Sequence, residues 1–286
     1  APQIASPSSW TFTTLDNQND PTFNQLLGIS NAGIIVGYFG SGATGHPNKG
    51  YRLVSPYGQT NYRNENFPGS AQTQVVAINN RHDTAGFWVD GNGNNFGFIR
   101  WNGVSTSYRN PHTGTGTVNQ LLGLNDRGIA VGFYTDGQGT NHGYAVNQAT
   151  GRFQAIVPPG GGSVIATGIN DNNDVTGIVT SGSTTAGFLM KNGAFSEFDF
   201  PASTNTTPFG INKSDQIVGA YVDGTGNTHG FLLSNPLRHA RWQSIDDPNG
   251  VGTTLINGIN DNDDLVGFYG NCGQSAPSCH GFLATP

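Results

Sequence analysis

Charged residues, helix formers and long apolar runs are all scarce in this sequence of 286 residues. Only 10% of the residues are charged, and the 12 Lys and Arg residues are not clustered, which excludes a basic surface for nucleic acid. No apolar run approaches the roughly 18 residues that a membrane-spanning helix needs. No window keeps an apolar period of about 3.6 residues, so the sequence predicts few helices.

Glycine and aromatic residues are abundant instead. The chain has 43 Gly, and Phe, Trp and Tyr together make up 10%. This aromatic content and a net charge of only −6 do not fit a disordered chain, but they are typical of short strands joined by tight turns. The chain begins at Ala1 without an initiator Met, as a signal peptidase leaves it, although a cloning choice gives the same start.

One motif recurs six times, a regularity that indicates a structural repeat. Each copy resembles G-I-N, then a polar turn, then I-V-G-F/Y, and successive copies are 42 to 49 residues apart. The third position of the motif is occupied by Ser30, Asn79, Asn125, Asn170, Asn212 and Asn260. Seven residues later stand Gly37, Gly86, Gly132, Gly177, Gly219 and Gly267.

Each repeat contains four predicted strands, which is the period of a β-propeller blade. The last copy stops at FLATP (282–286) without a fourth strand, and the chain starts with an unpaired fourth strand, WTFTTLD (10–16). The N-terminal strand can therefore complete the last blade. We predict an all-β, six-bladed propeller over residues 1–286 as one domain, with an open β-solenoid as the alternative.

The two cysteines bracket an insertion in the last repeat. Cys272 and Cys279 are seven positions apart, with Gly and Pro between them, a spacing that permits a disulfide. Two Cys and the adjacent His280 make an incomplete metal site. The sequence predicts a structural disulfide and hence a secreted or lumenal protein. It leaves open whether Asn205 or Asn212 is glycosylated.

The entrance of the first strand of each repeat predicts a pocket at the channel mouth. Gln25, Gln74 and Gln120 occupy one position in the first three repeats, where the others have Ile165, Thr207 and Leu255. Asn24, Thr73 and Asn119 lie one position further out, against Val164, Thr206 and Thr254. The amides predict a polar half-ring for a small-molecule substrate, or they hydrogen-bond neighbouring backbone groups.

Aromatic residues recur in the second strand and form either the walls of that pocket or packing between blades. They are Phe39, Trp88, Tyr134, Tyr221 and Tyr269, with Val179 as the exception. A histidine column, predicted to be structural, contains His142, His229 and His280. The first repeat departs furthest from the others, and its polar candidates are Lys49, Tyr57, Tyr62, Glu65 and Asn66. Lys49 is the candidate catalytic proton donor.

No nucleophile elbow, P-loop, HExxH or dinucleotide motif is present, so no cofactor is expected. The turns DNND (171–174) and DNDD (261–264) lack the EF-hand spacing, so no metal is expected either.

The repeat resembles the HAF-type extracellular repeat of secreted bacterial and fungal proteins. More narrowly, DPTFNQLLGISNAG (20–33), GHPNKGY (45–51), NENFPGS (64–70) and NQLLGLND (119–126) resemble the fungal hetero-Diels–Alderases of tropolonic sesquiterpenoid biosynthesis. The resemblance implies a pericyclase that joins a tropolone o-quinone methide to a humulene-type sesquiterpene, and it transfers no catalytic residue. The alternative is a lectin-like, non-catalytic propeller, which would keep its site residues in every blade. The oligomeric state stays open.

Overall fold

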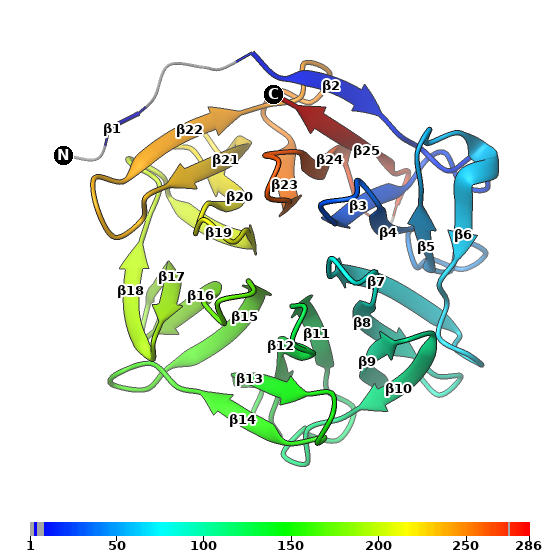
Figure 1. Cartoon of the computed structure of the whole chain (residues 1–286), viewed down its shortest axis with the longest axis horizontal. Helices are drawn as coiled ribbons and strands as arrows, with labels where there is room; N and C mark the ends of the chain where they lie inside the picture. The colour runs from blue at the N-terminus through cyan, green and yellow to red at the C-terminus, as the bar shows by residue number, and fades with distance from the viewer. Residues whose placement is uncertain (1–2, 5–8, 274) are drawn as a thin grey trace.

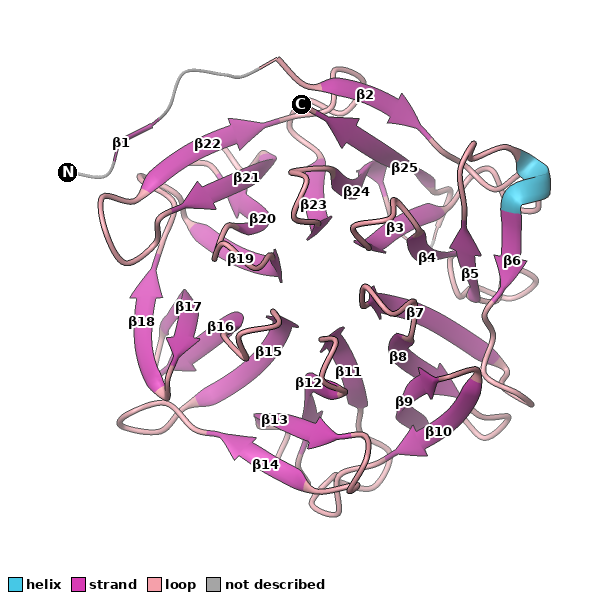
Figure 2. Cartoon of the chain, viewed as in Figure 1, coloured by secondary structure: helices cyan, strands magenta, loops and turns pink. Residues whose placement is uncertain are grey.

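The computed structural model describes residues 3–4, 9–273 and 275–286. These residues form a ring of six blades, each of four antiparallel strands, as Figure 1 shows. The predicted six-bladed β-propeller is thus confirmed. The first strand of each blade lies nearest the centre of the ring (Figure 1). Among the described residues, the one helix is the short 3-10 turn η1 (Gln59–Asn61) of blade one (Figure 2).

The blades follow one another along the chain. Blade one contains β3 (Asn24–Ile29), β4 (Ile35–Phe39), β5 (Lys49–Leu53) and β6 (Tyr62–Asn64). Blade two contains β7 (Gln72–Ile78), β8 (Thr84–Val89), β9 (Asn95–Trp101) and β10 (Val104–Tyr108). Blade three contains β11 (Asn119–Leu124), β12 (Ile129–Thr135), β13 (Asn141–Asn147) and β14 (Phe153–Ile156).

The second half of the ring has the same order. Blade four contains β15 (Ser163–Ile169), β16 (Val175–Ser181), β17 (Thr184–Lys191) and β18 (Ala194–Phe198). Blade five contains β19 (Asn205–Ile211), β20 (Ile217–Val222), β21 (Thr228–Ser234) and β22 (Arg241–Ile245). Blade six contains β23 (Thr254–Ile259), β24 (Leu265–Asn271), β25 (Ser278–Thr285) and β2 (Thr11–Thr14). A two-residue strand, β1 (Gln3–Ile4), adds to β22 in parallel.

The ring closes as the sequence predicts, by pairing its two ends. β2 runs antiparallel to β25, with Thr11 opposite Thr285 and Thr14 opposite Phe282. Figure 1 shows β2 as the outermost strand of blade six, next to the C-terminal strand. Ala1, which we expected to be a mature N-terminus, lies outside the described residues.

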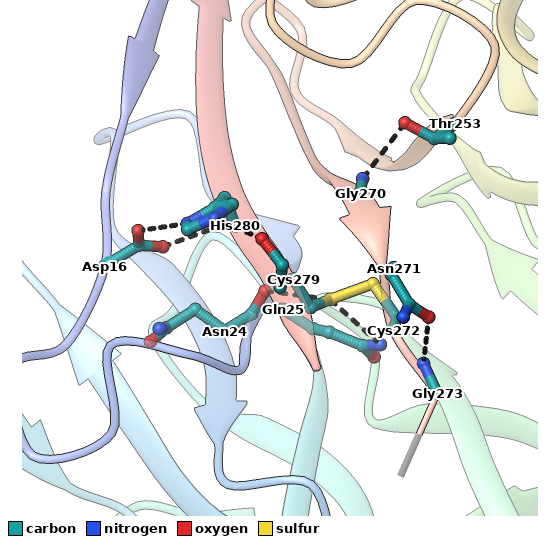
Figure 3. Close-up of a disulfide and its surroundings, with 12 residues drawn as sticks. Asp16, Asn24, Gln25, Thr253, Gly270, Asn271, Cys272, Gly273, Cys279 and His280 are labelled. Atoms are coloured by element: carbon teal, nitrogen blue, oxygen red, sulfur yellow. Dashed lines mark hydrogen bonds and ion pairs between the residues drawn. A yellow bond between two sulfur atoms is a disulfide. The ribbon is translucent and has the colours of Figure 1, made fainter. Parts of the chain in front are cut away.

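The disulfide lies at the seam between blades six and one. Cys272 and Cys279 are linked, and Cys279 is fully buried. The backbone N–H of Cys279 donates to Thr22 O at 3.0 Å, and His280 Nδ1 lies 2.7 Å from Asp16 Oδ2. Figure 3 shows the disulfide beside Gln25 and the imidazole of His280 turned toward Asp16. The loop of blade six is therefore fixed to the N-terminal segment as well as to its own blade.

The invariant glycine of the second strand has a steric cause. The first strand of every blade has a bulge opposite it, as between Leu121 and Gly123 in blade three. A Cβ on Gly132 would collide with the carbonyl oxygen of Gln120, and the equivalent glycine of every other blade meets the same first-strand carbonyl. Only glycine allows the two strands to approach this closely.

The Asn column joins the blades into a ring at the opposite face from the channel mouth. Each Asn side chain accepts hydrogen bonds from its own turn, as Asn125 Oδ1 does from the N–H groups of Arg127 and Ile129. Its Nδ2 donates to the carbonyl oxygen at the same position of the next blade. These five contacts, all between 3.0 and 3.2 Å, join Asn79 to Asn125, Asn125 to Asn170, Asn170 to Asn212, Asn212 to Asn260, and Asn260 to Ser30. Position 30 is Ser, whose short side chain makes no hydrogen bond to Asn79 in the described structure, so the sixth link is missing there.

Candidate functional site

The predicted amides at the channel mouth are partly exposed, but two of them have partners within the fold. Tyr38 Oη donates to Gln25 Oε1 at 2.7 Å, and Gln74 Nε2 donates to Asn48 Oδ1 at 2.9 Å. Gln120 has no hydrogen-bond partner among the described residues. Deeper in the channel are two small cavities of about 70 Å³ each. The residues one position further out cap the loops between blades, because Asn119 Oδ1 accepts from Asn110 N and Thr206 Oγ1 accepts from Phe200 N.

The second-strand aromatics do not meet in one pocket, because each lies over its own blade. Trp88 stacks between Phe67 and Phe96, with ring centroids 4.4 and 4.7 Å away. Tyr221 stacks on Phe200 at 3.6 Å. Three of the second-strand aromatics also hydrogen-bond to a hydroxyl on the fourth strand of the same blade. The pairs are Trp88 with Ser107 at 3.1 Å, Tyr221 with Ser244 at 2.9 Å, and Tyr269 with Thr14 at 3.1 Å.

The histidine column makes structural contacts. His229 Nδ1 lies 2.7 Å from Asp246 and its Nε2 lies 3.3 Å from Asp223. Burial lowers the pKa of His229, but the hydrogen bonds and charges of the two carboxylates outweigh it, so its pKa lies above the usual 6.5. No group of three or more metal-binding side chains occurs in the described part of the chain.

Blade one contains a pocket of about 320 Å³ that brings several sequence candidates together, and we call it the blade-one pocket. Lys49 and Phe39 of the predicted site line it, as do the polar candidates Tyr62 and Asn66. The other residues of its wall are Asn17, Asn19, Gly50, Tyr51, Arg63 and Asn64.

The other two candidates of blade one hold the scaffold. Glu65 is buried between Arg52 and Arg100 at 3.0 Å from each, and Tyr57 Oη donates to Gly33 O at 2.8 Å.

The blade-one pocket offers donors and positive charge. Lys49 and Arg63 are its charged lining residues, and neither has an ion-pair partner among the described residues. The hydroxyls of Tyr51 and Tyr62 are buried without a hydrogen-bond partner in the described structure. Burial raises the pKa of both tyrosines well above the usual 10.0, so both keep their protons. This set of groups favours a ligand that carries an electron-rich oxygen.

A second pocket, of about 480 Å³, lies at the equivalent place in blade three, and we call it the blade-three pocket. Tyr134 of the predicted site lines it, together with His142 of the histidine column. The remaining lining residues are Asn110, Pro111, His112, Gly143, Tyr144, Phe153, Ala155, Ile156, Val157, Pro158, Gly162 and Val164.

Sequence reasoning missed Tyr51 and Arg63 in the first pocket and, apart from Val164, the apolar wall of the second. Tyr51 belongs to the repeated H-G-F/Y motif and so looks structural. Comparison of the fourth strands would have shown Ala155 and Val157 as departures from the repeat.

The comparisons with known proteins show the fold alone. No family model and no curated protein matches the sequence. TolB from Acinetobacter baumannii is similar with a TM-score of 0.56 at 9% identity, over 94% of this chain and 66% of that one. A variant of the Aleuria aurantia lectin in complex with Fucα1-6GlcNAc has a TM-score of 0.52 at 11% identity, over 92% and 91%. A prolyl endopeptidase has a TM-score of 0.51 at 10% identity, over 92% of this chain and 39% of that one.

No helix of the described chain is long and apolar enough to cross a membrane. The disulfide and this finding are compatible with secretion, which stays a prediction. Of the two possible glycosylation sites, Asn212 is buried and donates to Asn260, whereas Asn205 is exposed.

Proposed function

We propose that the protein is a hetero-Diels–Alderase and that the blade-one pocket is its active site. The observation that carries the proposal is that Lys49, Tyr51 and Tyr62 line one pocket and that the buried hydroxyls of both tyrosines lack a hydrogen-bond partner among the described residues. Two segments that carry the resemblance to this enzyme family, 45–51 and 64–70, supply part of its wall. Its volume lies within the range of small-molecule sites.

The reaction needs donors and positioning rather than a nucleophile. A hydroxymethyl tropolone loses water, formed from its hydroxymethyl OH and the proton of the neighbouring ring hydroxyl, and becomes an o-quinone methide. Its exocyclic carbon and its oxygen then each form one σ bond to an alkene, and no atom leaves. A donor at that oxygen polarises the heterodiene, and holding the two partners in register lowers the barrier by several kcal/mol.

Lys49 is the group we assign to that oxygen. Its ammonium can protonate the departing hydroxyl and regain a proton from the neighbouring ring hydroxyl, and it can then donate a hydrogen bond to that ring oxygen during cycloaddition. Tyr51 and Tyr62 are neutral donors at the same wall, and Phe39 is an aromatic face against which a planar ring can lie.

The test incubates the protein with a hydroxymethyl tropolone and a hydroxylated humulene and measures adduct yield and stereochemistry against the spontaneous reaction. We expect one stereoisomer to be enriched. We expect K49M to lower the rate by about 10²-fold, as loss of one transition-state donor does. The matched control is K213M, because Lys213 is exposed in a turn between the first two strands of blade five, away from the blade-one pocket. An adduct profile identical to the spontaneous one would refute the proposal.

A lectin is the second candidate, and the presence of pockets at equivalent places in blades one and three favours it. Repeated pockets suit multivalent sugar binding, and the Aleuria aurantia lectin has a similar fold. The two pockets nevertheless differ in most of their lining residues, whereas a lectin with equivalent sites would keep them. Glycan-array binding at both pockets, without any effect on the cycloaddition, would favour the lectin.

A further inference from the structure

Blade three departs from blades two, five and six at three neighbouring positions around Tyr134. The first is in the fourth strand. Ser107, Ser244 and Thr14 lie opposite Phe98, Phe231 and Phe282 of the third strand, and their hydroxyls bind the second-strand aromatics. In blade three the residue at this place, opposite Tyr144, is Ala155. The hydroxyl of Tyr134 consequently has no hydrogen-bond partner among the described residues, and Tyr134 lines the blade-three pocket.

The second departure is at Val157. In blades five and six this place is occupied by Asp246 and Asp16, which bind the histidine Nδ1 of their own blade at 2.7 Å. His142 has no such carboxylate, and among the described residues its side chain hydrogen-bonds only to Asp136, through Nε2 at 2.8 Å. Its hydrogen bond lowers the pKa of Asp136, so that carboxylate is ionised and can only accept. Nε2 therefore carries a proton, and Nδ1, which is an acceptor in the neutral form of imidazole, has no partner in the described structure.

The third departure is at Asn110, where blades two and five have Phe67 and Phe200, although blade one also has an Asn there, Asn17. The backbone N–H of Asn110 donates to the first strand of the next blade, as the N–H groups of Phe67 and Phe200 do. Phe67 and Phe200 stack on the second-strand aromatic and fill the space above it. Asn110 is smaller, and the space above Tyr134 belongs to a cavity of about 480 Å³.

We propose that the blade-three pocket is a second binding site, for a neutral and mostly apolar small molecule that carries a hydroxyl group. Among the described residues, no Asp, Glu, Lys or Arg lines it, and Val157, Ile156 and Val164 form an apolar wall. Tyr134 presents a donor and His142 an acceptor, and their rings stack at 5.0 Å. A hydroxyl group donates and accepts through one oxygen atom, so it can satisfy both residues at once.

This site does not depend on the proposed function, because it shares no lining residue with the blade-one pocket. A ligand bound here could be a substrate part, a product or an unrelated molecule of the same chemistry. The test therefore measures binding and not turnover.

The experiment uses three probes with one skeleton: menthol, menthone and menthane-3-carboxylate, each titrated into the intact protein by calorimetry. We expect menthol to bind with a stoichiometry of one. We expect menthone, which only accepts, to bind about fivefold more weakly, since one neutral hydrogen bond is lost. The carboxylate should bind at least tenfold more weakly, because no Lys or Arg is among the described residues that line the pocket.

Three variants restore the residues of other blades. N110F should abolish binding by filling the cavity, A155S should weaken it about fivefold by giving Tyr134 a partner, and V157D should weaken it at least tenfold. Phe, Ser and Asp occupy these places elsewhere in this chain, so the fold should persist, which circular dichroism checks. V251D is the matched control, because Val251 is 69% exposed, close to the 66% of Val157, and does not line the pocket.

Unchanged menthol binding in both N110F and A155S would overturn the proposal. Preference for the carboxylate over menthol would also overturn it. A glycan that binds and is displaced by these same variants, with no menthol binding, would assign the pocket to carbohydrate and overturn it as well. Loss of menthol binding in K49M would show that menthol binds in the blade-one pocket, which would also overturn the proposal.

Discussion

Completing the ring of asparagine side chains should stabilise the protein. Five of the six inter-blade links are present, and the sixth is absent because position 30 is Ser. In S30N the new Nδ2 would face Asn79 O, whose carbonyl already accepts from His82 N and has a second lone pair free. The backbone at Ser30 matches the other copies, since its N–H donates to Ile34 O as Asn125 N–H does to Ile129 O.

The expected gain follows from one buried hydrogen bond. A net neutral hydrogen bond contributes about 1 kcal/mol to the free energy of unfolding. Ser30 already accepts weakly from Ile34 N at 3.3 Å, and an Asn Oδ1 would accept the same group with the geometry found in other blades. A gain of about 1 kcal/mol raises Tm by about 2 °C in a chain of this size.

Differential scanning calorimetry and guanidinium unfolding of wild type and S30N measure this gain. The reverse variant, N170S, removes an existing link and leaves Asn212 O with one donor fewer, so it should cost about 1–3 kcal/mol. A third variant, S30A, removes only the local hydrogen bond that Ile34 N donates to the Ser30 hydroxyl, so it measures that bond apart from the inter-blade link. If S30N is neutral or destabilising while N170S is also neutral, the ring of side chains does not hold the blades together.

Three further predictions concern the seam, the histidine column and the glycine column. Replacing Cys272 and Cys279 by Ser should lower the free energy of unfolding by about 2–3 kcal/mol, the loop-closure value for so short a ring, and dithiothreitol should then have no further effect on the denaturation midpoint. Because the pKa of His229 is raised in the folded protein, its contribution to stability is fully present below the usual pKa of 6.5 and is lost as pH rises through the folded value. The Tm difference between wild type and H229Q should therefore be larger at pH 5.5 than at pH 9. Equal differences at the two pH values would refute this. G219A should destabilise by about 1–3 kcal/mol or more in thermal unfolding, because its Cβ would collide with Thr207 O, whereas the exposed G224A should be tolerated.

The architecture could be predicted because its determinants repeat. Gly132 and Asn125 each belong to a set of six equivalent positions, and each set has a local cause. At Gly132 the bulge of the first strand leaves no room for a Cβ, and at Asn125 the side-chain amide of the turn reaches the next blade. Closure could be predicted as well, because the last repeat lacks a fourth strand and the chain starts with an extra one.

The site could be predicted only in part. Lys49 and Phe39 meet in one pocket because they are paired neighbours on β4 and β5. The glutamines were harder, because their partners differ from blade to blade: Gln25 meets Tyr38 of its own blade, whereas Gln74 meets Asn48 of the neighbouring blade. Sequence position shows that a residue is near the mouth but not which neighbour takes its hydrogen bonds.

The two pockets show how a repeat scaffold can acquire distinct sites. The columns that hold the ring, at Asn125 and Gly132, are kept in blade three, although Ala155 and Val157 in the same blade depart from the repeat. The departures lie in the fourth strand and in the loop that follows it, where a side chain contacts its own blade and one neighbour. A change there leaves one aromatic or histidine without its partner and opens one cavity without breaking a link of the ring. Sites of different chemistry can therefore occupy equivalent places, a donor-rich one at Lys49 and a neutral one at Tyr134.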